Sequence, residues 1–121
     1  MRSGSGKEGW DLNAQISEHP QGIVVKLSGD IGMLEVDALA ARFKQILERK
    51  PKLVVLDLSG VGMLASAGIG SMIALRRDLG KTGGAVRLAA IRPQVKESLR
   101  RALVDRIVQM FDTVEAALSA T

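Results

Sequence analysis

The hydroxyl of Ser66 is the group in this sequence best placed to do chemistry. It lies in the segment LASAGIG (residues 64–70), between an apolar run and an expected helix. A serine nucleophile needs a general base within reach, but the only histidine, His19, falls in an expected hairpin turn. The segment also lacks the Gly-x-Ser-x-Gly pattern of a nucleophile elbow. We therefore expect that Ser66 is not catalytic and that the protein is not an enzyme.

Cofactor and metal sites are equally unsupported by the sequence. Gly-x-x-x-x-Gly-Lys-Ser/Thr does not occur, and the one Gly-x-Gly-x-x-Gly, at residues 4–9, does not follow an expected strand, so the usual phosphate cradles are missing. With no cysteine and one histidine, we expect no bound metal and no cofactor. A small ligand or nucleotide at the turn GVGMLASAGIG (residues 60–70) remains a weaker alternative, because that turn has no aromatic residue on which a base could stack.

The net charge of +4 raises the question of a polyanionic partner. Basic residues gather late in the chain, at Arg87, Arg92, Lys96, Arg100, Arg101 and Arg106. Nucleic-acid binding would call for a recognisable motif or aromatic platforms as well, and the sequence has neither. We interpret the basic residues as a solvated helix face. No apolar run approaches the ~20 residues of a membrane span, and the start MRSGSGKEGW does not look like a secretory signal, so we expect a cytoplasmic protein without membrane insertion.

The elements that must position Ser66 follow from hydrophobic periodicity and turn residues. Strands are expected at 13–18, 23–28, 52–59, 85–91 and 107–111, and helices at 33–50, 69–84, 93–103 and 114–120. Leu34, Leu39, Phe43, Ile46 and Leu47 recur at helical spacing in the first of these helices. Alternating strands and helices predict a single α/β domain over residues 11–121, with a mixed, mostly parallel sheet, an N-terminal hairpin and about four helices. Residues 1–10 are expected to be a flexible tail or a cloning remnant.

Two roles for Ser66 follow from its place at the start of the expected helix. As an N-cap, its oxygen would accept a hydrogen bond from the N–H of Gly68 or Ile69. As a modification site, it would carry a phosphate, which the partial positive charge of a helix N-terminus tolerates. Ala67 and Gly68 would leave room for another protein to approach. The residues alone do not decide between these roles.

Two long segments resemble STAS domains, the family of bacterial anti-sigma factor antagonists. They are LVVLDLSGVGMLASAGIGSMIALRRDLGKTGGAVRLAAI (residues 53–91) and SLRRALVDRIVQMFDTVEAAL (residues 98–118), and the likeness extends over about residues 12–120. The resemblance implies a regulatory protein that binds an anti-sigma factor which is also a serine kinase. It also implies that phosphorylation of the residue matching Ser66 ends this binding, with Gly68 matching the glycine that follows in the family motif.

The chain departs from the family pattern around this site. Ala65 replaces an aspartate, Ala67 replaces a serine or threonine, and Gly32 replaces a second aspartate, while Asp30 stands where a glutamate is usual. Leu103 replaces a glycine of the closing segment, which we interpret as a packing change. These departures predict an unusually apolar, uncharged site, in which phosphotransfer is impaired if the missing carboxylates orient the hydroxyl or contact the kinase.

Two functional hypotheses therefore stand. The first is an antagonist of an anti-sigma factor kinase, switched at Ser66. The alternative is an adaptor or scaffold subunit that is not phosphorylated, in a stress-sensing or membrane transport complex. For either partner, the expected contact surface consists of Asp30, Gly32, Met63, Leu64, Ala65, Ser66, Ala67, Gly68 and Ile69. Taken one by one, Met63, Leu64 and Ile69 are more readily interpreted as core residues, and Met33 and Met72 are ambiguous between core and surface. The sequence makes no prediction of oligomeric state.

Overall fold

The computed structural model describes residues 12–120, and the expected tail at 1–10 lies outside this range. The strands are β1 (Asn13–Glu18), β2 (Ile23–Ser28), β3 (Leu53–Gly60), β4 (Ala85–Ala89) and β5 (Gln109–Phe111). The α-helices are α1 (Val36–Glu48), α2 (Ser66–Gly80), α3 (Pro93–Arg101) and α4 (Val114–Ser119), and two short 3-10 turns are η1 (Met33–Glu35) and η2 (Val104–Arg106). This is the expected α/β domain, and each expected strand is present.

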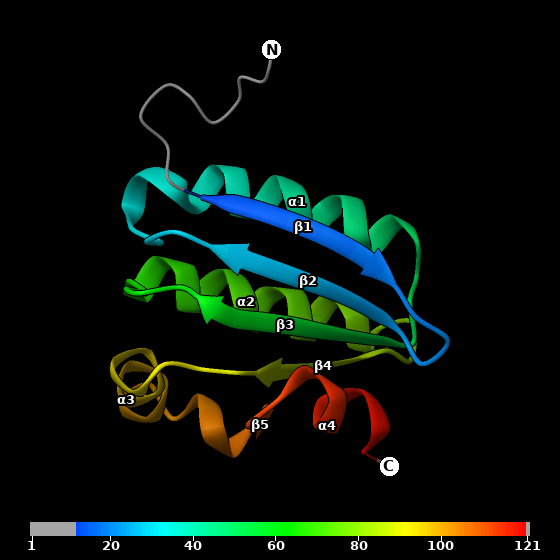
Figure 1. The fold of residues 1–121 in the computed structure, drawn as a ribbon. Coiled ribbons are helices and arrows are strands. Elements are labelled where there is room, and N and C mark those ends of the chain that lie inside the picture. Colours follow the sequence, from blue (N-terminus) through cyan, green and yellow to red (C-terminus); the bar gives the residue numbers. More distant parts are fainter. Residues whose placement is uncertain (1–11, 121) are drawn as a thin grey trace.

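The five strands form one sheet in which spatial order follows chain order, β1-β2-β3-β4-β5. The hairpin β1–β2 is antiparallel, and every later pair is parallel. Parallel neighbours need a crossover, and right-handed crossovers that advance in one direction place their helices on one face of the sheet. Figure 1 shows α1 and α2 together behind the sheet, with α4 on the opposite side over β4 and β5.

The sheet has a hydrophobic core on each face. Val54, Leu56 and Leu58 of β3 point into the larger core with α1 and α2, whereas Leu53 and Val55 pack in a smaller core that includes Ala117 of α4. The near-continuous apolar run of β3 reflects this cover on both faces. Within residues 12–120, no helix is long and apolar enough to cross a membrane.

Several element boundaries differ from the sequence-based expectation. The helix expected at 33–50 begins with η1, and α1 starts only at Val36. Leu34, expected on the apolar face of that helix, is consequently 80% exposed, because the 3-10 turn has a different residue period from the α-helix that follows. Strand β4 ends before Ala90, whose φ of 57° leaves the extended region.

Candidate functional site

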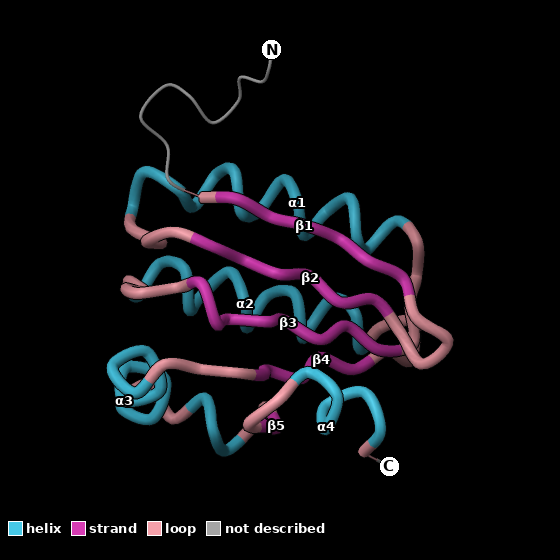
Figure 2. The backbone as a smooth tube through the Cα atoms, in the orientation of Figure 1, coloured by secondary structure: helices cyan, strands magenta, loops and turns pink. Residues whose placement is uncertain are grey.

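The loops that follow β2 and β3 are joined beyond the ends of both strands. Ile31 and Leu64 form an isolated parallel bridge. The Ile31 N–H donates to the Met63 carbonyl at 2.8 Å, and the Ala65 N–H donates to the Ile31 carbonyl at 2.8 Å. Figure 2 shows these two loops side by side at the same end of the sheet. This pairing fixes the start of α2, and therefore Ser66, against the β2 loop.

Ser66 is the first residue of α2 and not its N-cap, so the capping role is wrong. The N-cap is Ala65, and no side chain caps this helix. The N–H groups of Gly68 and Ile69, the expected donors to the Ser66 hydroxyl, donate instead to the Ala65 carbonyl at 2.9 and 3.1 Å. Ser66 is exposed, and the first turn of α2 contains no acidic residue. Its hydroxyl is therefore accessible at the positive end of a helix.

Three residues of the expected contact surface belong to the interior. Leu64 and Ile69 are 5% and 6% exposed and take part in the main core. Gly68 is also buried, and a methyl group there would lie 2.8 Å from both Ile31 Cγ2 and Leu64 Cδ1. The expected room beside Gly68 is thus filled by the protein itself, because its missing side chain lets α2 pack closely on the joined loops.

The exposed part of the site combines apolar side chains with Ser66. Met33 and Leu34 are 75% and 80% exposed, and Met63 is 44% exposed. Gly32 links them, since a methyl group on Gly32 would lie 3.5 Å from Met63 Cε. Here the term Ser66 surface denotes the exposed residues Asp30, Met33, Leu34, Met63 and Ser66 together with half-buried Gly32, Ala65 and Ala67. The sequence left Met33 ambiguous between core and surface, and helical spacing wrongly assigned Leu34 to the core. Met72, also ambiguous in the sequence, is a core residue, 3% exposed.

A carboxylate does reach the site, contrary to the expectation of an uncharged one. The side chain of Glu35 turns back to Gly32, whose N–H donates to Glu35 Oε1 at 2.8 Å. The same oxygen lies 3.3 Å from the position of a side chain on Gly32. Glu35 therefore brings negative charge to the place where the family's second aspartate is missing. The contact surface expected from the sequence did not include Glu35, and its position three residues after Gly32 was the available signal.

The start of α3 holds the loop that leads to Ser66. The Arg92 Nε donates to the Ser59 carbonyl at 2.8 Å, and the Gln94 Nε2 donates to the Gly62 carbonyl at 2.9 Å. A methyl group on Gly62 would lie 3.2 Å from Asp30 Oδ1 and 3.4 Å from Arg92 Nη1. Gly62 is thus flanked by an acid from the β2 loop and a base from α3. The loop before Ser66 is held from both sides.

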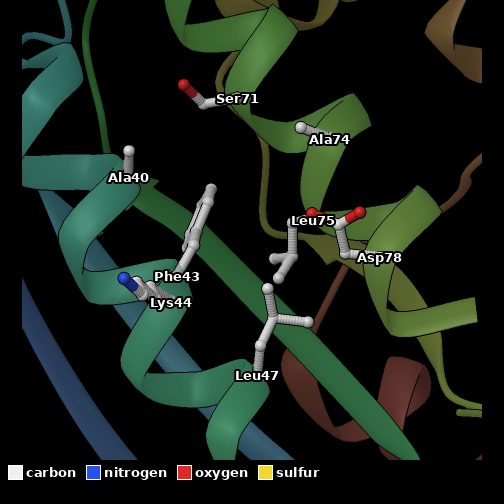
Figure 3. A pocket seen from close by; sticks show the side chains of 8 residues that line it. All are labelled: Ala40, Phe43, Lys44, Leu47, Ser71, Ala74, Leu75 and Asp78. Atoms are coloured by element: carbon white, nitrogen blue, oxygen red, sulfur yellow. The ribbon is translucent and has the colours of Figure 1, made fainter. Parts of the chain in front are cut away.

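A groove of about 370 Å³ runs between α1 and α2 (Figure 3). Its lining comprises Ala40, Phe43, Lys44 and Leu47 from α1 and Ser71, Ala74, Leu75 and Asp78 from α2. Buried Phe43 and Leu75 make its apolar wall, while Lys44 and Asp78 lie on opposite helices. The groove is formed by the two helices and not by the turn at 60–70, where the sequence left open a ligand or nucleotide site.

The family follows from comparison with known proteins. The model of the STAS domain family matches residues 13–117. The chain is a STAS domain. This confirms the resemblance seen in the sequence, and it confirms the α/β fold with an antiparallel N-terminal hairpin and an otherwise parallel sheet.

Solved structures of regulatory proteins and of a transporter family protein share the fold of this STAS domain. An anti-sigma factor antagonist from Mycobacterium paratuberculosis is similar at 27% identity, covering 89% of this chain and 92% of that one, with a TM-score of 0.83. The phosphorylated form of the Bacillus cell fate determinant SpoIIAA shares the fold at 17% identity, covering 88% and 96%, with a TM-score of 0.68. A sulfate transporter family protein from Wolinella succinogenes shares it at 18% identity, covering 79% and 80%, with a TM-score of 0.68.

Proposed function

We propose that this STAS domain is a regulatory binding protein whose partner is an anti-sigma factor with serine kinase activity. The Ser66 surface is the contact in this proposal, and phosphorylation of Ser66 ends the contact. The observation that carries the proposal is the position of Ser66, exposed at the first residue of α2 and three residues after exposed Met63. The similarity to an anti-sigma factor antagonist supports the class of partner.

The composition of the Ser66 surface suits a protein partner. Met33, Leu34 and Met63 offer flexible apolar side chains that gain free energy when a partner removes them from water. Exposed apolar side chains that lie together mark interaction sites more often than isolated ones. The joined loops supply a rigid base for them, because the backbone hydrogen bonds between Ile31, Met63 and Ala65 fix both loops.

Phosphorylation would change this surface at its edge. A phosphoserine adds nearly two negative charges, which the N-terminus of α2 tolerates within the free protein. At the interface the same charge must lose its water, so a partner bound over Ser66 would bind less tightly. The phosphorylated form of SpoIIAA, which shares this fold, gives a precedent for a phosphorylated STAS domain.

The experiment uses a purified anti-sigma factor kinase from the same genome with Mg²⁺ and ATP. We expect phosphate at Ser66 by peptide mass spectrometry, and a complex with the unmodified chain that the phosphorylated chain does not form. The Ser66→Ala variant should bind but remain unmodified. Ser71→Ala is the matched control, because Ser71 lies in the same helix and its hydroxyl donates to the Ala67 carbonyl at 3.3 Å. Absence of both complex and phosphate with every such kinase of that genome would reject the proposal.

A second candidate function is an adaptor subunit that is not phosphorylated, in a transport or stress-sensing complex. Two observations favour it, namely the fold shared with a sulfate transporter family protein and the presence of Ala65 and Ala67 on either side of Ser66. Ser66→Asp separates the two functions. If the chain is an antagonist switched at Ser66, the variant does not bind the kinase. If the chain is an adaptor, the variant keeps its partner, and Ser66 of the wild-type chain is unmodified in cells.

A further inference from the structure

The structure carries a second apolar surface, and it is basic where the Ser66 surface is acidic. Leu103 and Ile107, on either side of η2, are 54% and 43% exposed. The arginine patch denotes these two residues with exposed Arg76, Arg100 and Arg106. Hydrogen bonds tie the arginines to the apolar pair: Arg76 Nε donates to the Ile107 carbonyl at 3.0 Å, and the Leu103 and Arg106 N–H groups donate to Arg100 and Leu103 carbonyls.

The charges around the arginine patch leave a positive excess. Arg101 pairs with Glu97 at 3.5 Å, and Arg77 pairs with Asp78 at 3.2 Å, so these two arginines are partly neutralised. Asp105, exposed within η2, lowers the positive charge of the patch by one. Arg100 and Arg106 have no carboxylate partner within salt-bridge distance among residues 12–120. An approaching acidic group would therefore find arginines to pair with.

Leu103 is held in an unusual backbone conformation while its side chain stays exposed. Its φ is 61°, in the left-handed region that favours glycine. The side chain contributes little to the core, since more than half of its surface is exposed. The backbone conformation does not favour a leucine at position 103, and the core does not require one. An interface that covers the side chain would explain why a leucine is present.

The complementary surface is present on the same molecule. Exposed Met33 and Leu34 are flanked by the carboxylates of Asp30, Glu35 and Asp37, which together form the acidic patch. Arg92 approaches this patch near Asp30, since both side chains lie close to Gly62. The two patches lie at different edges of the domain: α1, which follows η1, runs behind β1 at one edge, and α3 and η2 lie beside β5 at the other (Figure 1).

We propose that the arginine patch of one copy binds the acidic patch of the next, so that the chain associates head to tail. Each apolar pair then covers the other, and arginines meet carboxylates around it. Because the two surfaces differ, the contact is heterologous and leaves a free patch at each end of an oligomer. The association also covers part of the Ser66 surface, so copies compete with the proposed partner; only this last consequence rests on the proposed function.

The test is sedimentation velocity of the full chain over a range of concentrations, in low and high salt. The wild type should show an average mass that rises with concentration without stopping at two chains, and high salt should weaken the association about tenfold or more because it screens the charges. A monomer at every concentration up to about 1 mM in low salt would overturn the proposal, as would a closed dimer indifferent to salt.

Two charge-reversal variants make the test specific. Asp30→Lys with Asp37→Lys reverses the acidic patch, and Arg100→Glu with Arg106→Glu reverses the arginine patch. Each variant alone should stay monomeric, and their equimolar mixture should associate again, since each retains the patch that the other lacks. Recovery in the mixture also excludes misfolding as the cause of the loss. Lys26→Glu, exposed on β2 outside both patches, is the matched control and should leave association unchanged. Unaltered association of both variants would contradict the proposed surfaces.

Discussion

Ile31 and Leu64 pair across the loops that follow β2 and β3, although both lie beyond the ends of their strands. Gly68 packs directly on both side chains, at a distance that admits no further carbon atom. The start of α2 is therefore fixed by a three-way contact between two loops and a helix. Ser66 owes its position to this contact.

Gly68→Ala should destabilise the protein. The added methyl group would meet Ile31 and Leu64 at 2.8 Å, and overpacking of this kind costs about 1–3 kcal/mol of unfolding free energy. Gly70→Ala, two residues on in the same helix, is the control, because nothing lies within 4 Å of its added carbon. There the helix should gain about 0.5–1 kcal/mol. Urea unfolding followed by circular dichroism measures both, and equal effects at the two sites would contradict the packing argument.

Substitutions of Ser66 should leave the domain folded. Since no side chain caps α2, Ser66→Ala is expected to change the unfolding free energy by less than about 0.5 kcal/mol. Ser66→Asp places a negative charge at the helix N-terminus and should stabilise by about 0.3–1 kcal/mol at low salt. Thermal unfolding tests both. A loss near 1 kcal/mol in Ser66→Ala would instead indicate a hydroxyl cap.

Removal of the side-chain bonds from α3 should loosen the loop before Ser66 without unfolding the domain. Arg92→Ala and Gln94→Ala each delete one bond to a loop carbonyl, at Ser59 or Gly62. We expect faster hydrogen exchange at the Ile31 and Ala65 amides, which bridge the two loops. Arg100→Ala, on the exposed face of the same helix, is the control and should leave these amides protected. Unchanged exchange in both loop variants would show that the backbone bonds alone hold the loop.

Leu103→Gly should stabilise the protein even though it removes an apolar side chain. A left-handed backbone costs an L-residue about 1–2 kcal/mol, and glycine adopts it freely, so we expect a gain of about 1 kcal/mol after the greater freedom of glycine in the unfolded chain is counted. Leu103→Ala keeps the strain and should change stability little. Chemical denaturation, under conditions that keep the chain monomeric, measures the unfolding free energy of both variants. A loss of stability in Leu103→Gly would mean that the leucine side chain contributes to packing.

Asp78 should respond to pH through its two basic neighbours. A hydrogen bond from Arg77 at 3.2 Å, and Lys81 at 3.4 Å, lower the pKa of the Asp78 carboxyl. Because the pKa is lower in the folded than in the unfolded state, the stabilisation is present above the unfolded pKa and is lost as the pH falls through the folded one. Arg77→Gln should raise the pKa of Asp78, as measured by NMR titration. A pKa that stays in place would assign the shift to Lys81.

The sequence predicted the fold well because its signals were local. His19, expected in the hairpin turn, does lie between β1 and β2, where its N–H and carbonyl both bond to Gly22. The strand expected at 52–59 is β3, Leu53–Gly60, and it contributes to the core on both faces of the sheet. Family resemblance then supplied the place of Ser66.

The details of the site depended on contacts between distant residues, which no local pattern contains. The capping role failed because α2 begins one residue earlier than the cap required, with Ala65 in the extended backbone region. Leu34 was assigned to a core face because helical spacing was extended through what is a 3-10 turn. Glu35 was missed because its importance comes from its bond to Gly32. Leu103 was interpreted as a packing change, whereas its backbone conformation is the notable feature.

The order of the strands has a consequence for synthesis of the chain on the ribosome. Because β1 to β5 occur in the sheet in the order in which they are made, each strand can pair with its predecessor as soon as it emerges, without waiting for a later segment. The exception is the second face of β3, where Leu53 and Val55 wait for α4, which follows every strand of the sheet in the chain. A nascent chain that stalls before residue 114 thus exposes an aliphatic stripe that the complete domain hides.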